Sequence, residues 1–425
     1  MPAISAPHPF AKLGVLALVA VSACGTSDQG YPTAGASTSP SGGASSATGG
    51  APVGASGGAT GSNGGASTSP TPDASTNQIP GAIVGRGSDS PIEVSAQLIK
   101  SNCSPAAATA DGALMAFNVR GSNGLFDAYL GNTRCEGQPL LPPYDGHRGA
   151  GDMTPDGRYV LLVIARGWDK ATSGAEPGKG SSNSIDILDR NTGVVSTLVP
   201  SYCNSCQRGA IWPRLSPDGA KMAWTEMVQT PVEVSPIGRF TLHVSTLSPD
   251  RTSVASDVVW QPRSSGSVLV EAYGWLSGTT DIIFASNDGV TNCNLTSCLQ
   301  LFRLSEQLPD LPATLLTPPV NGSNAYHEFS HFRGDGWVYT SIGRDGLGAD
   351  LWRMKPDGSN QERVTFFGGA YSLAVMGFSQ VTGFPEPTFS IVGGMATVPG
   401  GFIAGVIHDQ NATSIDAWRI DIVAR

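Results

Sequence analysis

The sequence LSPDGAKMAWT, residues 215–225, combines a tight turn with an alternating strand. Proline fixes φ at the first turn position, the aspartate side chain bonds back to the backbone, and glycine adopts the positive φ that closes a hairpin. After the turn, Met222 and Trp224 fall on one face, because side chains alternate along a strand. The stretch therefore predicts a half-buried β-hairpin.

Five weaker copies of this turn and strand recur along the chain. They lie at residues 108–118, 153–163, 275–285, 332–342 and 397–407. With the first stretch included, the turn glycines are Gly112, Gly157, Gly219, Gly278, Gly336 and Gly401, spaced by 45 to 65 residues. A second strand pattern follows most copies, such as LFDAYLG at residues 125–131. Repeats of this length built from strands alone predict an all-β fold, a six-bladed β-propeller of four-stranded antiparallel blades.

The last repeat is incomplete, and a stretch before the first repeat can complete it. No outer strand follows residues 414–422, whereas PIEVSAQLI at residues 91–99 alternates and precedes blade one. We expect residues 91–99 to pair with blade six and close the ring, because closure removes an open sheet edge.

The N-terminus has the pattern of an export signal. Lys12 precedes an apolar run at residues 13–21, which is too short to span a membrane as a mature helix. Val-Ser-Ala-Cys at residues 21–24 resembles a bacterial lipobox, which implies a signal peptide at residues 1–23 and lipidation of Cys24. The alternative is an ordinary signal peptide with a cysteine near its cleavage site.

Two further segments follow the signal. Residues 24–80 are mainly Gly, Ser, Ala, Thr and Pro, and such a composition cannot bury enough apolar surface to fold. We expect a disordered tether spanning on the order of 40 Å, followed by the propeller at residues 81–425. The formal net charge of −9 argues against nucleic acid as the main partner. We expect a monomer.

The cysteine count agrees with export. Six cysteines remain besides Cys24: Cys103, Cys135, Cys203, Cys206, Cys293 and Cys298. An even count in an exported chain predicts disulfides. Proximity favours the pairs Cys203–Cys206 and Cys293–Cys298, which leaves Cys103–Cys135 across the first blade. A redox or zinc role for the Cys-x-x-Cys pair is the alternative, but its usual structural context is missing.

Residues 327–331, His-Glu-Phe-Ser-His, spell a zinc-protease signature. That chemistry needs a helix, which brings two histidines four residues apart onto one face. Here the segment runs directly into a repeat, so we expect a strand, where residues four apart are separated by roughly 13 Å. We therefore predict no metal site there.

The sequence otherwise offers few chemical groups for a site. It contains no nucleophile elbow, phosphate-binding loop or dinucleotide fingerprint in the required context, so no catalytic residue and no cofactor is predicted. The innermost strand of each blade borders the central channel, so we expect residues that precede the turns on these strands to be able to face it. The candidate channel-lining residues are Trp212, Arg214, His327 and Glu328.

LSPDGAKMAWT and DLWRMKPDGSNQERVT (residues 350–365) resemble the repeats of TolB-like β-propellers. Units of that family pair a Ser-Pro-Asp-Gly turn with an outer Asp-hydrophobic-aromatic strand and a second Asp-Gly turn. The resemblance covers about residues 95–425 and is weakest for blades four and six. It implies a bacterial envelope protein whose propeller is a docking surface, and it transfers no partner-binding residue, since the shared letters are turn and packing positions.

These observations lead to two functional hypotheses. The favoured one is a membrane-tethered lipoprotein of the bacterial cell envelope, on the periplasmic or surface face of the outer membrane, that binds a protein or glycan without catalysis. The alternative is an enzyme, either a polysaccharide lyase or a hydrolase of a lactone or glycan, with its site in the channel. The second hypothesis requires His, Asp, Glu or Arg side chains that converge on the innermost strands.

Overall fold

The computed structural model describes fourteen segments of the chain: residues 83–85, 92–122, 125–144, 146–165, 183–201, 209–229, 239–290, 299–305, 312–317, 325–332, 334–344, 350–365, 390–407 and 415–424. The predicted signal peptide, Cys24 and the tether lie outside them, so those boundaries remain predictions. The same holds for Cys203, Cys206, Cys293 and Cys298. None of the described segments forms a helix long and apolar enough to cross a membrane.

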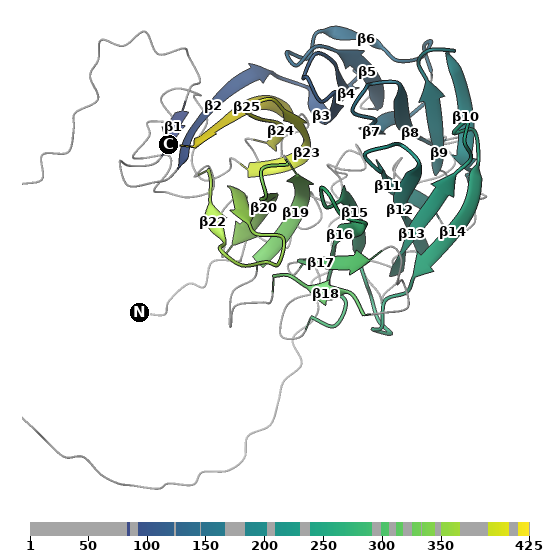
Figure 1. Cartoon of the computed structure of the whole chain (residues 1–425). Coiled ribbons are helices and arrows are strands. Elements are labelled where there is room, and N and C mark those ends of the chain that lie inside the picture. The colour runs from purple at the N-terminus through teal and green to yellow at the C-terminus, as the bar shows by residue number, and fades with distance from the viewer. Residues whose placement is uncertain are drawn as a thin grey trace, which may run out of the picture. The chain divides into compact units, whose positions relative to one another are not determined.

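Six antiparallel sheets surround a central axis, which confirms the six-bladed propeller (Figure 1). Blade one contains β3 (Ser104–Ala108), β4 (Met115–Arg120), β5 (Phe126–Gly131) and β6 (Gly137–Pro139). Blade two contains β7 (Arg148–Met153), β8 (Tyr159–Ala165), β9 (Asn183–Asp189) and β10 (Val194–Val199). Blade three contains β11 (Gly209–Leu215), β12 (Lys221–Gln229), β13 (Arg239–Leu247) and β14 (Val254–Trp260).

The remaining blades follow the same order. Blade four contains β15 (Val270–Trp275), β16 (Asp281–Ser286), β17 (Gln300–Ser305) and β18 (Thr314–Leu315). Blade five contains β19 (Ala325–Phe332), β20 (Val338–Arg344), β21 (Asp350–Met354) and β22 (Glu362–Arg363). Blade six contains β23 (Ser390–Val398), β24 (Gly401–Ile407) and β25 (Asp416–Ala424), and two strands from before blade one, β1 (Ile83–Gly85) and β2 (Ile92–Lys100), complete its sheet.

The ring closes through β2, as predicted. It pairs antiparallel with β25 over its whole length, with Ala96 opposite Ile420, and β1 pairs with its outer edge. Strands that are more than three hundred residues apart in sequence therefore share one sheet. β1 makes this the one five-stranded sheet among the described residues, an addition that the sequence does not predict.

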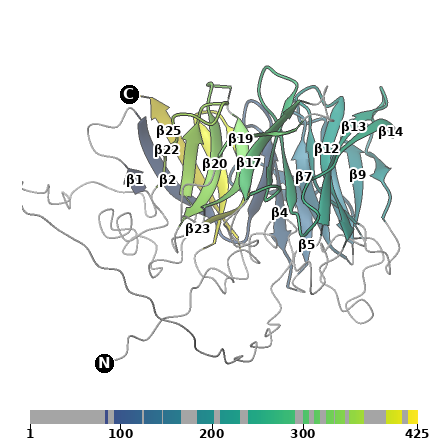
Figure 2. The ribbon, with the colours of Figure 1, turned by 90° about the horizontal axis from the view of Figure 1, so that it is seen from below.

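The first strand of each blade lies innermost, so β3, β7, β11, β15, β19 and β23 surround the channel (Figure 1). Each contacts the first strand of the next blade around the ring. Seen from the side, the strands stand upright along the axis (Figure 2). The core lies between blades: Leu161 and Ile187 of blade two pack with Met222 and Trp224 of blade three.

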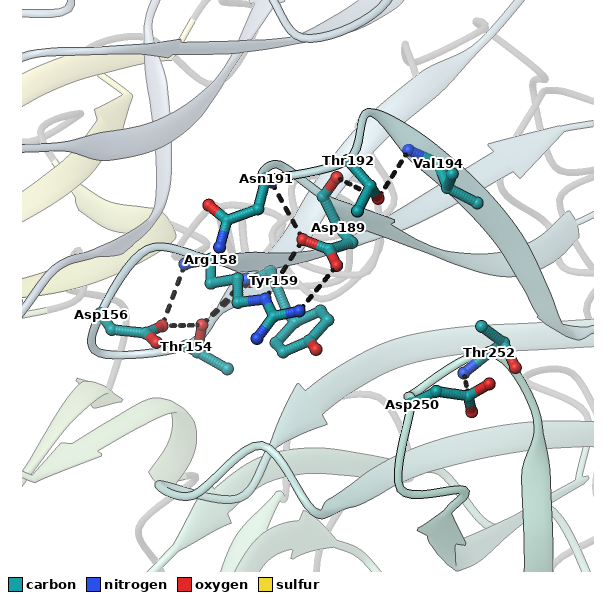
Figure 3. Close-up of polar contacts among 10 residues, drawn as sticks. All are labelled: Thr154, Asp156, Arg158, Tyr159, Asp189, Asn191, Thr192, Val194, Asp250 and Thr252. Atoms are coloured by element: carbon teal, nitrogen blue, oxygen red, sulfur yellow. Dashed lines mark hydrogen bonds and ion pairs between the residues drawn. The ribbon is translucent and has the colours of Figure 1, made fainter.

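The inner hairpin turns of blades one, two and three use the expected chemistry, which Figure 3 shows for blade two. The Thr154 hydroxyl donates to Asp156 Oδ1 at 2.6 Å, the Arg158 amide donates to the same oxygen at 2.9 Å, and Gly157 has a φ of 72°. These hydrogen bonds, with the one from Thr154 first, lower the pKa of Asp156. In blade six the prediction was wrong by one residue, because Gly400 takes the positive φ of 83° while Gly401 pairs with Asp421 in the sheet.

Cys103 and Cys135 form the predicted disulfide of the first blade, with their Cα atoms 6.4 Å apart. Both cysteines are buried and pack with Met115 and Phe117 of β4 and with Ile403 of blade six. The disulfide therefore ties the entrance of blade one to the loop between β5 and β6, next to the blade that closes the ring.

Candidate functional site

All six innermost strands carry a β-bulge where they pair with the second strand of their blade. The register shifts fall between Pro105 and Ala107, Ala150 and Asp152, Ile211 and Arg214, Ala272 and Gly274, Glu328 and His331, and Ile391 and Met395. A bulge adds unpaired residues to one strand and so changes which face the following side chains occupy. Asp152, Arg214 and His331 each follow directly after such a bulge.

A cavity of about 260 Å³ lies within this ring of bulges. All six innermost strands line it, and Pro155, Ser216, Pro217 and Ser277 extend the lining into the inner hairpin turns. The cavity therefore occupies the part of the channel nearest those turns. Its polar side chains include Asp152, Arg214, Tyr273 and His331.

Asp152 and Arg214 fasten blade two to blade three at the cavity wall. The Arg214 Nη1 donates to the Gly151 carbonyl oxygen at 2.6 Å, and the Leu215 amide donates to Asp152 Oδ2 at 2.7 Å. The Met153 amide donates to the other carboxylate oxygen at 2.8 Å. Burial raises the pKa of Asp152, while Arg214 and the two amides oppose that rise. We refer to Asp152, Arg214 and these bonds as the blade clasp.

Arg214 keeps binding capacity beyond the clasp. The residue is only 8% exposed, and its Nε atom is buried without a hydrogen-bond partner among the described residues. A buried guanidinium with an unused donor is energetically costly unless something accepts from it. Arg214 itself lines the cavity, so its guanidinium lies where a ligand would be bound.

Glu271 lies behind Tyr273 on the same strand. The Tyr273 hydroxyl donates to Glu271 Oε2 at 2.6 Å, whereas Oε1 is buried without a partner among the described residues. Burial raises the pKa of Glu271 to about 7, against the opposing effects of Tyr273 and Arg214. Near neutral pH this carboxyl therefore exchanges between its charged and its neutral form.

His331 is the channel histidine of blade five. Burial, together with the positive charge of Arg214, lowers its pKa to about 3, so the imidazole is neutral at physiological pH. Its Nε2 is buried without a partner among the described residues, and its ring meets Phe402 edge-on at 6.4 Å between centroids. A neutral imidazole can both donate and accept a hydrogen bond.

The structure separates the four predicted channel residues. Arg214 lies on the cavity wall. Trp212 instead packs into the hydrophobic cluster of blades three and four, 6.0 Å from Phe240 between ring centroids. His327 is buried in β19, where its backbone amide bonds to Leu299 of blade four, and it does not line the cavity. The side chain of Glu328 lies outside the described part of the chain.

Residues 327–331 lie in β19, as predicted, and not in a helix. Within the described segments, no group of three His, Cys, Asp or Glu side chains is arranged to hold a metal ion. Four residues at or directly behind the cavity wall were missed by sequence reasoning: Asp152, Glu271, Tyr273 and His331. Gly151 and Pro213, which interrupt otherwise strand-like runs, were the available signals, since glycine and proline inside a strand mark bulges.

The fold and the cavity together define a six-bladed β-propeller with a cluster of polar groups in its channel. No protein-family model matches the sequence, and no curated protein matches it either. TolB from Acinetobacter baumannii is similar in structure, with 12% identity, a TM-score of 0.42, and coverage of 72% of this chain and 63% of that chain.

Two enzyme structures show the same degree of similarity. A prolyl endopeptidase matches with 12% identity and a TM-score of 0.42 over 73% of this chain and 40% of its own. An oligogalacturonate lyase in complex with manganese matches with 10% identity and a TM-score of 0.40 over 81% of this chain and 97% of its own. The chain thus spans less than two thirds of the endopeptidase and of the Acinetobacter TolB. At these identities the similarity concerns the fold alone.

Proposed function

We propose that this protein is a non-catalytic binding propeller of the bacterial cell envelope that holds a protein or glycan partner at the turn end of its channel. The observation that supports this most directly is the cavity lined by all six innermost strands, with Arg214, whose buried Nε has no partner among the described residues, on its wall. Propeller channels are places where loops and strand ends from every blade converge, so one small region receives contributions from the whole chain.

The envelope part of the proposal is supported by the N-terminal sequence and by the disulfide. A lipidated Cys24 and the tether at residues 24–80 would hold the propeller at a membrane. Disulfides persist in oxidising compartments, and Cys103–Cys135 fits such a location.

Lipid anchoring is tested by metabolic labelling with a radioactive fatty acid in a bacterial host. We expect wild-type protein to be labelled and to sediment with membranes, and Cys24→Ser to lose both properties. Equal labelling of the two proteins would contradict the anchor.

Partner binding is tested with full-length oxidised protein immobilised on beads and exposed to cell-wall glycans and to envelope proteins. We expect Arg214→Met to lower partner retention roughly ten-fold or more, the usual scale for a lost hydrogen bond to a charged group. The matched control is Arg158→Met, since the Arg158 side chain is 42% exposed, pairs with Asp189 and does not line the cavity. Equal retention by wild type and Arg214→Met would contradict binding in the channel.

A catalytic role is the second candidate, and the pair of Glu271 and Tyr273 favours it. A carboxyl with a pKa of about 7, bonded at 2.6 Å to a phenol on the cavity wall, is suited to general acid–base chemistry. The reaction class would be cleavage of a glycan by hydrolysis or elimination. Product formation that Tyr273→Phe abolishes would establish this role, and an absence of product from a broad glycan panel would leave the binding role alone.

A further inference from the structure

We infer that the cavity accepts one neutral, hydroxyl-rich sugar ring. This inference rests on the proposed binding function and specifies its ligand. Its starting point is the balance of charge around the cavity. The permanent cation Arg214 lies beside the Asp152 carboxylate in the blade clasp, and the neighbouring imidazole of His331 is neutral.

The charge balance favours a neutral ligand over a charged one. Both carboxylate oxygens of Asp152 accept from backbone amides, so the cavity wall carries one negative group near the positive charge of Arg214. An anionic ligand would add a further negative charge in a buried region next to Glu271. A cationic ligand would be placed close to Arg214 itself. Burial of an unmatched charge is strongly unfavourable, whereas a neutral polar group needs only hydrogen bonds.

The hydrogen-bonding groups favour hydroxyls. Arg214 can only donate, the Asp152 carboxylate can only accept, and the neutral imidazole of His331 can do both. The Tyr273 hydroxyl donates its hydrogen to Glu271, so it can accept a hydrogen bond from a ligand. A ligand with neighbouring groups that each donate and accept can satisfy this mixed set. Adjacent hydroxyls on a sugar ring have that property, and carbonyl-only or amine-only ligands do not.

The size and the apolar surface of the cavity fit one ring. At about 30 Å³ per water molecule, a cavity of about 260 Å³ has room for roughly nine waters. Its lining residues include Tyr273, Trp275, Ala106 and Met395, whose side chains are largely apolar. The C–H faces of a sugar can pack on such a surface while its hydroxyls reach the polar groups. Because all six inner strands surround the cavity, we expect it to take the end of a glycan chain.

The test is saturation-transfer NMR on full-length protein with three matched sugars, which are glucose, glucuronate and glucosamine. The same measurement is made with galactose, galacturonate and galactosamine. These sets keep the ring and change the charge. We expect transfer to a neutral sugar, and weaker or no transfer to its charged relatives. Stronger transfer to the uronate or to the amino sugar, or none to any neutral sugar, would overturn the inference.

Two variants locate the binding. Arg214→Met should weaken affinity for the neutral sugar roughly ten- to a hundred-fold, while Arg158→Met should leave it unchanged. Because Arg214 also fastens two blades, Ser277→Trp provides a second test: Ser277 lies in an exposed turn at the cavity rim, and a large ring there blocks entry without touching the blade clasp. Full affinity in both Arg214→Met and Ser277→Trp would overturn the inference.

This experiment also separates the sugar assignment from the proposed function. If envelope partners still depend on Arg214 while no neutral sugar binds, the binding propeller stands and the sugar assignment is wrong. If neither capture nor sugar binding responds to Arg214→Met and Ser277→Trp, both proposals fail.

Discussion

The inner hairpin turns differ between the two sides of the ring. In blades one, two and three, a Cβ on the turn glycine would lie 2.8 Å from the preceding blade: Gly112 from Pro399 Cδ, Gly157 from Thr109 Cγ2, and Gly219 from Thr154 Cγ2. In blades four and five, a Cβ on Gly278 or Gly336 would meet nothing within 4 Å. We call the first group nested turns and the second group open turns.

This difference fits the degenerate inner turn of blade four, where Gly278 lacks the preceding Pro-Asp. A nested turn must close its own hairpin and also fit the turn beside it, as when the Ala110 amide donates to the Pro155 carbonyl oxygen at 2.9 Å. An open turn must only close its hairpin, so other sequences suffice. The blade clasp lies on the nested side, whereas Glu271, Tyr273 and His331 belong to the blades with open turns.

Removal of the Cys103–Cys135 disulfide, which lies in blade one on the nested side, should produce the largest loss of stability. Closing a loop of 32 residues stabilises the fold by about 3–4 kcal/mol in the loop-entropy model. We expect the Cys103→Ala/Cys135→Ala variant to lose that amount of unfolding free energy in a denaturant titration. Its hydrogen exchange should rise first in blade one. An exchange increase confined to blades four and five would contradict the comparison.

Glu271→Gln, in blade four with its open turn, should remove a loss of stability that depends on pH. A buried carboxyl whose pKa is raised from 4.5 to about 7 favours the protonated native state, so it costs roughly 3 kcal/mol of stability as pH rises through that interval. Glutamine cannot ionise and can still accept from Tyr273. We therefore expect the Tm of the variant to exceed that of wild type by more at about pH 8 than at about pH 5. A Tm difference independent of pH would contradict the assignment.

Paired glycine substitutions test the two classes of turn directly. Gly157 and Gly336 both have a positive φ, in the left-handed region. Alanine at either position should therefore lower the unfolding free energy by about 1–2 kcal/mol. Only Gly157→Ala also meets a neighbouring blade, and such overpacking adds about 1–3 kcal/mol. We expect Gly157→Ala to unfold at a lower denaturant concentration than Gly336→Ala. Equal denaturation midpoints for the two variants would show that the contact with the neighbouring blade does not affect stability.

The smallest effect should come from the ion pair beside the nested turn of blade two. Arg158 contacts both carboxylate oxygens of Asp189, at 3.2 and 3.0 Å, and lowers its pKa (Figure 3). Asp189→Asn keeps an acceptor for the Asn191 amide and removes the charge. The lowered pKa means that the contribution of this pair exists above the unfolded pKa and disappears as pH falls. We expect a small decrease in Tm that added salt reduces, and a decrease that grows with salt would contradict the ion-pair explanation.

Local sequence signals were enough to predict the architecture of the propeller. Turn chemistry and alternation are local properties, so residues such as Pro217, Asp218 and Gly219 predict a hairpin wherever they occur. Six such signals predicted six blades, and the alternating stretch before blade one predicted the strand that closes the ring. Its one error in turn position, at Gly401, arose where two consecutive glycines leave the left-handed residue undefined by sequence.

The residues that line the channel depend instead on contacts between distant parts of the chain. Arg214 was a candidate from sequence, but its use depends on Gly151 and Asp152, which lie 63 and 62 residues earlier. Each bulge adds unpaired residues to an inner strand, and a shift of one residue exchanges the two faces of that strand. Sequence alternation cannot say where that exchange occurs, so Trp212 lies in the core while Asp152 and His331 line the cavity.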